Sequence, residues 1–170
     1  MDTSEIRRLL EFRTDSAPVV ITLDGGAGTG KTSLARSLAS KLEIKYLDTG
    51  AMYRSIALNL GAEAWSQPAE WLEKQLAGIS FSLSGFGENT LLSLNGSPMG
   101  EAIRREEVGM WASKIAGLSV VRNYLTRCQR ELGNSFSLVA EGRDMGSVVF
   151  PDARFKYFLE ADTEKRARRR

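Results

Sequence analysis

An α/β fold with a central parallel sheet flanked by helices is predicted from three features of the 170-residue sequence. First, residues 19–23 (VVITL) form a short β-branched apolar run, which is typical of a strand buried on both faces of a parallel sheet. Second, residues 32–42 carry apolar side chains at a helical period. Third, further short apolar runs alternate with helical segments along the chain, an order that favours a parallel sheet.

Local patterns predict the remaining elements of the first half. Residues 1–17 are predicted to form a short polar helix and a linker, an N-terminal extension peripheral to the fold. Residues 45–47 favour a second strand, and a helix is expected over residues 51–60. After a loop, Pro68 opens a helix that runs to about Leu76, because proline is tolerated in a first turn.

The second half begins with a change of period. Within residues 79–99, Ile79, Phe81 and Leu83 alternate with serines, and a second alternating piece follows at residues 91–94. The next residues, Asn95-Gly96, are a strong hairpin signal. A small antiparallel insertion is therefore expected there. The rest of the chain is predicted to contain helices over 101–116 and 119–132, buried strands over 137–140 and 155–159, and a basic helix from Thr163. We expect residues 18–170 to form a single domain.

Composition excludes several classes of function. Histidine is absent and Cys128 is the single cysteine, so neither an intrachain disulfide nor a mechanism with a histidine base is possible. The formal net charge is only +2, whereas affinity for nucleic acid rests on many Lys and Arg contacts to phosphate. No apolar run is long enough to span a bilayer. We expect a cytoplasmic monomer with no nucleic-acid or membrane partner.

The loop after the first strand carries the pattern G-x-x-x-x-G-K-[ST], met by Gly25, Gly30, Lys31 and Thr32. Glycines let the backbone wrap around phosphate oxygens, and successive N–H groups then point inward at the positive end of the following helix. We expect the loop to bind ATP, with Lys31 on the β and γ phosphates and the Thr32 hydroxyl as a ligand of Mg²⁺. The predicted ATP-binding residues of the loop are Gly25, Gly26, Ala27, Gly28, Thr29, Gly30, Lys31, Thr32 and Ser33. The loop alone does not separate a kinase from a GTPase or a motor ATPase.

Two further segments lie where a second substrate would bind. Thr49 follows the second strand, where it can cap the next helix, and Arg54 lies about one and a half turns further on. Arg143 and Asp144 follow the strand predicted over 137–140, and ligands of parallel sheets gather beyond the carboxyl ends of strands. An arginine there can stabilise charge on a transferring phosphoryl group. The alternatives are a capped helix with a solvated arginine, and a surface loop with a local Arg–Asp pair.

These motifs together resemble the bacterial cytidylate kinase family. The matching stretches are ITLDGGAGTGKTSLA, LDTGAMYRSIAL, GEAIRREEVGMWASKIA, VVRNYLTRCQREL and VAEGRDMGSVVFPDARFKYFLEADTEKRARRR, in the family's order. The segments DTGAMYR and EGRDMGSVVFPDA are far more specific than the phosphate loop. The resemblance implies transfer of the γ-phosphoryl group of ATP to CMP or dCMP, giving CDP or dCDP. The family also carries an extra antiparallel sheet where the insertion at 79–99 falls.

The resemblance also implies roles for individual residues. We expect Lys31, Arg143 and Asp144 to take part in catalysis. The implied acceptor-binding residues are Thr49, Tyr53, Arg54, Arg104, Ser113, Arg122, Arg143 and Asp144. Among them, Ser113, Arg122 and Asp144 resemble the residues that contact cytosine. For Arg104, Ser113 and Arg122 the alternative is an exposed helix face.

The sequence departs from the family's pattern in two places. The loop has Gly26-Ala27 where the family usually shows proline and serine, but phosphate binding rests on the backbone. The family continues past Arg170 through the rest of an arginine-bearing lid, of which residues 163–170 are the expected start. Arg166 and Arg169 are thus expected to touch ATP, the alternative being a solvated basic helix. The shortened lid leaves open a fragment, an impaired enzyme or a non-catalytic nucleotide-binding module. A different P-loop small-molecule kinase is a further alternative.

Overall fold

The computed structural model describes residues 18–162, 164 and 166. Its contacts divide these residues into two compact units. Unit 1 comprises the chain up to Asp48, residues 84–90 and the chain from Leu132 onward, whereas unit 2 comprises residues 49–83 and 91–131. The predicted helix over 1–17, and most of the basic helix predicted from Thr163, lie outside the described residues. The single-domain assignment stays a prediction.

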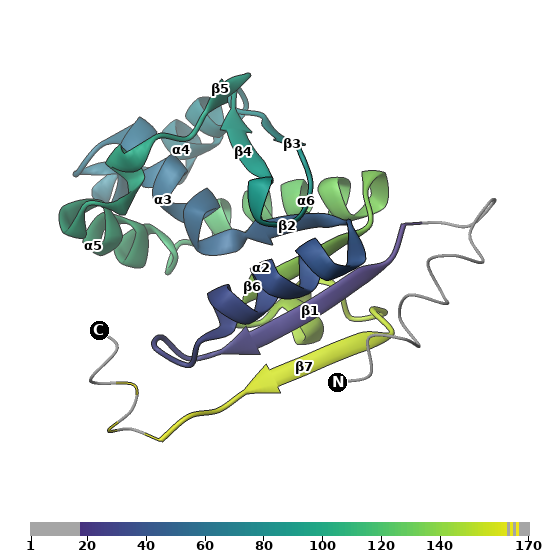
Figure 1. Ribbon diagram of the computed structural model, residues 1–170. Helices are drawn as coiled ribbons and strands as arrows, with labels where there is room; N and C mark the ends of the chain where they lie inside the picture. The colour runs from purple at the N-terminus through teal and green to yellow at the C-terminus, as the bar shows by residue number, and fades with distance from the viewer. Residues whose placement is uncertain (1–17, 163, 165, 167–170) are drawn as a thin grey trace. The chain divides into compact units, whose positions relative to one another are not determined.

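Unit 1 is built on a four-stranded parallel sheet, which confirms the predicted fold class. Figure 1 shows β1 and β7 as parallel arrows, with α2 alongside β1. The strand order is β2-β6-β1-β7, and all three pairings are parallel. The elements are β1 (Val20–Gly25), α2 (Lys31–Leu42), β2 (Lys45–Asp48), β6 (Leu138–Gly142) and β7 (Phe155–Leu159).

The core of unit 1 lies between the sheet and α2. The buried stripe of α2 packs against Ile21 and Leu23 of β1 and Val139 of β6. Each fully buried Leu or Ile side chain contributes roughly 1.5–3 kcal/mol through removal of apolar surface from water. The helical stripe consists of Ala35, Leu38, Ala39 and Leu42. This packing fixes the loop between β1 and α2, because both of its ends are anchored in the same core.

The strand β7 differs from the prediction. The sequence predicts a buried strand, yet exposed and half-buried side chains alternate along β7, and Phe158 is 67% exposed. Among the described strands β7 pairs with β1 alone. Lys156 in the middle of the run already indicates a period of two rather than burial on both faces.

Unit 2 is mainly helical and carries the predicted antiparallel sheet, whose strand order is β3-β4-β5. The turn between β4 and β5 is Asn95-Gly96, and both residues have positive φ, as a two-residue hairpin requires. The Asn95 side chain binds the backbone of Ser80 and Gly78. The elements that lie wholly or mainly in unit 2 are α3 (Thr49–Leu60), η1 (Ala64–Ser66), α4 (Ala69–Leu76), β3 (Phe81–Ser84), β4 (Leu91–Leu94), β5 (Ser97–Pro98), η3 (Glu101–Arg104), α5 (Glu106–Ile115) and α6 (Ser119–Ser135).

The single helix predicted over 101–116 is wrong. The chain forms the short 3-10 helix η3 and then α5, because Arg105 is extended, with ψ at 143°. Glu106 and Glu107 occupy the first turn of α5, where negative charge is favourable. The predicted helix over 119–132 is confirmed and extends to Ser135. No helix within the described part of the chain is long and apolar enough to cross a membrane.

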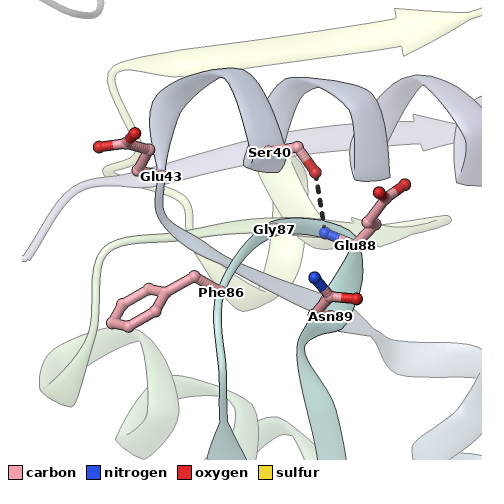
Figure 2. Close-up of a pocket in the computed structure, with 6 residues that line it drawn as sticks. All are labelled: Ser40, Glu43, Phe86, Gly87, Glu88 and Asn89. Atoms are coloured by element: carbon pink, nitrogen blue, oxygen red, sulfur yellow. Dashed lines mark hydrogen bonds between the residues drawn. The ribbon is translucent and has the colours of Figure 1, made fainter.

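Segment 84–90 connects β3 and β4 but packs in unit 1. It includes the 3-10 helix η2 (Gly87–Asn89), which contacts α2. Figure 2 shows the Glu88 N–H donating to the Ser40 hydroxyl near the end of α2, at 2.9 Å. A hollow of about 560 Å³ is lined by Ser40, Glu43, Phe86, Gly87, Glu88 and Asn89. It lies at the end of α2 opposite the phosphate loop, roughly 13 Å along the helix from Lys31.

Candidate active site

The loop from Gly25 to Gly30 joins β1 to the N-terminus of α2. Gly28 and Gly30 adopt φ of 77° and 88°, the left-handed region that L side chains rarely occupy. Gly30 is the N-cap of α2, and no acidic side chain lies in the first turn of this helix. The helix dipole and the free backbone N–H groups of a first turn favour an anion there.

Lys31 is held over the loop. Its ammonium donates to the carbonyl of Gly26 at 3.2 Å, and the Thr29 hydroxyl donates to the same carbonyl at 3.0 Å. Lys31 is half-buried, so part of its side chain is accessible. A compact ammonium in this place can move from a carbonyl to a phosphate oxygen of a bound nucleotide.

One buried carboxylate joins the loop to the sheet. Glu141, the fourth residue of β6, is 3% exposed. Its Oε2 accepts the Thr32 hydroxyl at 2.9 Å, and its Oε1 accepts the Tyr46 hydroxyl. Burial raises the pKa of the Glu141 carboxyl, and the nearby Asp48 carboxylate raises it further, whereas the two hydroxyl donors lower it. Burial likewise raises the pKa of Tyr46.

A second buried carboxylate ties β1 to the chain after β6. Asp24 accepts the backbone N–H groups of Met145 and Gly146, both at 2.8 Å. These residues open η4 (Met145–Val149), a π-helix that the sequence analysis did not predict. Asp24 thereby anchors the backbone directly after Arg143 and Asp144.

Neither Glu141, Asp24 nor Tyr46 was among the residues singled out from the sequence. A signal existed for the two carboxylates, because each stands near the carboxyl end of an apolar strand. No local signal pointed to Tyr46, which lies 95 residues from its partner Glu141.

Arg143 and Asp144 leave the sheet at the same edge as the phosphate loop. The parallel register pairs Asp24 of β1 with Gly142 of β6, so Gly25 and Arg143 follow at neighbouring positions. Arg143 is exposed and Asp144 is half-buried. The Asp144 carbonyl accepts the N–H groups of Val148 and Val149, which fixes its backbone at the start of η4.

The other acceptor candidates lie in unit 2. Thr49 is buried and is the first residue of α3, so it lies inside the helix rather than at a preceding cap position. Tyr53 is half-buried and Arg54 is exposed on the same helix. Within unit 2, α3 packs against both α5 and η3, which carry further candidates.

Arg104, Ser113 and Arg122 have exposed side chains. Arg104 pairs with Glu101 at 3.3 Å, and the Ser113 hydroxyl donates to the carbonyl of Gly109 on its own helix at 3.0 Å. This exposure fits ligand contact and fits an exposed helix face equally well. Their roles in substrate binding stay predictions.

Arg166 lies directly on the phosphate loop. Its Nε donates to the Ala27 carbonyl at 3.0 Å. A Cβ atom on Gly26 would lie 2.8 Å from the Arg166 guanidinium, and one on Gly28 would lie 2.7 Å from the Arg166 carbonyl oxygen. Arg166 therefore already contacts the loop that is expected to bind ATP, and its own contact with ATP stays a prediction. Arg169 lies outside the described residues.

The donor atoms at the loop suit a hard cation that is shared with a nucleotide. The Thr32 hydroxyl and the Glu141 carboxylate offer oxygen ligands, which Mg²⁺ prefers. Within the described residues no group of three or more His, Cys, Asp or Glu side chains is arranged to hold a metal ion. A magnesium ion at this site would therefore depend on phosphate oxygens and water for its remaining ligands.

A phosphate loop between β1 and α2, with a carboxylate, an arginine and an aspartate at the end of the adjoining strand, defines a P-loop nucleotide-binding protein of the phosphotransferase type. Comparison with known proteins specifies the family. Residues 21–170 match the family model of cytidylate kinase. The chain belongs to the cytidylate kinase family.

Individual relatives agree with this assignment. The chain is 58% identical over 152 residues to a cytidylate kinase of Oleidesulfovibrio alaskensis, an alignment that covers 89% of this chain and 69% of the relative. It is 54% identical over 153 residues to a cytidylate kinase of Maridesulfovibrio salexigens, covering 90% and 69%. A cytidylate kinase of Lawsonia intracellularis is 44% identical over 151 residues, covering 89% and 67%. The resemblance noted from the sequence is confirmed.

Proposed function

We propose that this protein transfers the γ-phosphoryl group of ATP to CMP or dCMP, giving ADP and CDP or dCDP. The observation that carries the proposal is the phosphate loop of a chain that matches the cytidylate kinase family over residues 21–170. Phosphoryl transfer depends mainly on positioning and electrostatic stabilisation, so it needs no histidine base. The absence of histidine is compatible with this chemistry.

The donor half binds ATP. The backbone N–H groups of the loop and of the first turn of α2 bind phosphate oxygens, and Lys31 moves from the Gly26 carbonyl to the β and γ phosphates. The Thr32 hydroxyl would hold Mg²⁺ with the nucleotide, and the Glu141 carboxylate beside it accepts the Thr32 proton. Bound magnesium neutralises charge that develops on the phosphate oxygens. In this proposal Arg166, already on the loop, and Arg169 also contact ATP.

The acceptor half binds the nucleoside monophosphate. In this proposal Thr49, Arg54 and Arg143 bind its phosphate, Tyr53 forms a wall of its pocket, and Arg104 adds positive charge nearby. Arg143 also stabilises charge on the transferring group. Ser113, Arg122 and Asp144 bind the base.

Asp144 accounts for the choice of cytosine. A carboxylate accepts a hydrogen bond from the amino group at C4 of cytosine. Uracil carries a carbonyl there, which would place two acceptors face to face and leave both unsatisfied. We propose further that the protein acts as a cytoplasmic monomer in pyrimidine nucleotide metabolism, without nucleic-acid partners.

The test is a coupled assay with ATP and Mg²⁺ against CMP, dCMP, UMP, AMP and dTMP. The proposal expects turnover with CMP or dCMP and at least ~100-fold lower kcat/KM with UMP, the discrimination that an unpaired buried polar group brings. Turnover with UMP or AMP but none with CMP or dCMP would indicate another nucleotide kinase. Binding of ATP and CMP without transfer would indicate a non-catalytic module. Asp144→Ala should lose preference for cytosine over uracil while its KM for ATP stays within ~3-fold of the wild type.

A further inference from the structure

Tyr46 is buried on β2, one carboxylate away from Thr32, and takes no part in the reaction proposed above. It is 4% exposed on β2, and its hydroxyl donates to Oε1 of Glu141. Glu141 is two residues beyond Val139, the register partner of Tyr46, so both side chains point to the same face of the sheet. The other oxygen of the same carboxylate accepts the Thr32 hydroxyl.

The position of Tyr46 is fixed from several sides. Its backbone N–H donates to the Thr90 hydroxyl at 3.1 Å, and Thr90 in turn donates to the Gly87 carbonyl at 2.8 Å. The Arg36 guanidinium lies over the Tyr46 ring, 5.4 Å from its centroid. The Tyr46 hydroxyl is thus a hydrogen-bond donor in a fixed position. A phenylalanine ring would have nearly the same shape but no hydroxyl to donate.

The hydrogen bond from Tyr46 affects Thr32 because both hydroxyls donate to the same carboxylate, that of Glu141. A hydroxyl has one proton and two lone pairs, so donation of the Thr32 proton to Glu141 turns the lone pairs of the Thr32 oxygen elsewhere. With Oε1 held by Tyr46, Oε2 stays in place to accept that proton. Loss of the Tyr46 hydroxyl would leave Oε1 with one donor fewer in a buried place, and the carboxylate would rotate to share the donors that remain.

We propose that Tyr46 is a positioning residue of the nucleotide site: through Glu141 it fixes the direction in which Thr32 donates its proton, so that the Thr32 oxygen is available to the cation that accompanies ATP. This inference rests on the proposed kinase function. It predicts that Tyr46 matters for the metal-bound nucleotide and not for the nucleotide alone.

The test compares Tyr46→Phe with Tyr124→Phe. Tyr124 is a matched control, because its hydroxyl is also buried but donates to the backbone carbonyl of Ile79 in unit 2. Calorimetric titration with ATP is carried out with excess Mg²⁺ and again with excess EDTA. Tyr46→Phe should weaken binding of magnesium-bound ATP about 5- to 20-fold, roughly the contribution of a single hydrogen bond, and binding of metal-free ATP less than ~2-fold. Tyr124→Phe should leave both affinities unchanged.

Steady-state kinetics provide a second readout. The KM for magnesium-bound ATP should rise in Tyr46→Phe, whereas the KM for CMP should not. Equal weakening with Mg²⁺ and with EDTA would mean that the substitution merely disturbs the fold, and the inference would be overturned. Unchanged affinity in both conditions would overturn it as well.

A double-substitution cycle tests the route through Thr32. Thr32→Val keeps the β-branched shape and removes the hydroxyl, so Tyr46→Phe should have no further effect on magnesium-bound ATP in that background. Additive effects would overturn the inference. Its failure is distinguishable from failure of the proposed function, because a wild-type protein that phosphorylates CMP while Tyr46→Phe binds ATP normally contradicts the inference alone.

Discussion

The carboxylate of Asp24 accepts the backbone N–H of Met145 at 2.8 Å, and this bond joins the strand before the phosphate loop to the segment that carries Arg143. The second carboxylate oxygen accepts the N–H of Gly146 at the same distance. The phosphate loop and the segment that carries Arg143 are thus held together by one buried side chain, which is 7% exposed.

Replacement of Asp24 by asparagine should therefore destabilise the protein. An amide has one acceptor oxygen, and its NH₂ group would face the second N–H donor across a buried contact. We expect a loss of about 2 kcal/mol in the free energy of unfolding, measured by urea denaturation, because bonds to a buried charged acceptor are strong and a buried donor is left unpaired. The exposed Asp152→Asn is the control and should keep the wild-type midpoint. A wild-type midpoint in Asp24→Asn would contradict the role assigned to Asp24.

The two glycines under Arg166 should tolerate alanine unequally. In Gly26→Ala the new Cβ meets the far end of the flexible Arg166 side chain, which can shift. In Gly28→Ala it meets the Arg166 backbone, and the residue must also keep a φ of 77°. We expect Gly28→Ala to weaken ATP binding at least ~10-fold and Gly26→Ala less than ~3-fold, since positive φ costs about 1–2 kcal/mol and distorts the loop. Calorimetric titration with ATP measures both.

Gly61→Ala is a control that introduces backbone strain outside the phosphate loop. Gly61 also has a positive φ, of 86°, but nothing lies within 4 Å of a Cβ atom placed there, and it belongs to unit 2. This variant should lower thermal stability without a change in ATP affinity. Equal ATP affinities for the Gly26 and Gly28 variants would show that contact with the Arg166 backbone does not shape the loop.

Much of the fold was predictable because its signals are local. The β-branched run before the loop and the helical stripe of α2 depend only on residues within a few positions of one another. The Asn95-Gly96 turn is similarly encoded by two residues that accept positive φ. The break at Arg105 was missed because a 3-10 turn followed by a helix repeats apolar side chains at nearly the same period as one long helix.

The sequence motif of the candidate site was predictable, but the hydrogen bonds that link it to distant segments were not. The spacing of Gly25, Gly30 and Lys31 is a local pattern, whereas the pairing of Tyr46 with Glu141 and of Asp24 with Met145 arises only when distant strands adjoin. The sheet register brings these pairs together, and no periodicity in a single sequence specifies it.

Lys31 should be indispensable for turnover. Its ammonium donates to the loop carbonyl of Gly26 at 3.2 Å, and we assign it to the β and γ phosphates. Lys31→Ala should lower kcat with CMP at least ~100-fold, equivalent to about 2.7 kcal/mol of lost transition-state stabilisation. Lys41→Ala, an exposed lysine of the same helix, is the control and should stay within ~2-fold of the wild type. Unchanged turnover in Lys31→Ala would remove this lysine from the mechanism.

Glu141 should give the stability of the protein a measurable pH dependence. Burial raises the pKa of its carboxyl above the ordinary value of 4.5, so the folded state binds this proton more tightly than the unfolded state. Stability from this group is therefore fully present below pH 4.5 and is lost as pH rises through the folded pKa. Glutamine does not titrate, so Glu141→Gln lacks this pH-dependent loss of stability. As pH rises from 4.5 to about 8, the free energy of unfolding of the wild type should therefore decrease relative to that of Glu141→Gln. Urea denaturation across this range, with the exposed Glu88→Gln as control, measures the difference. A wild-type free energy that instead rises relative to Glu141→Gln would mean that the hydroxyls of Tyr46 and Thr32 outweigh burial at this carboxylate.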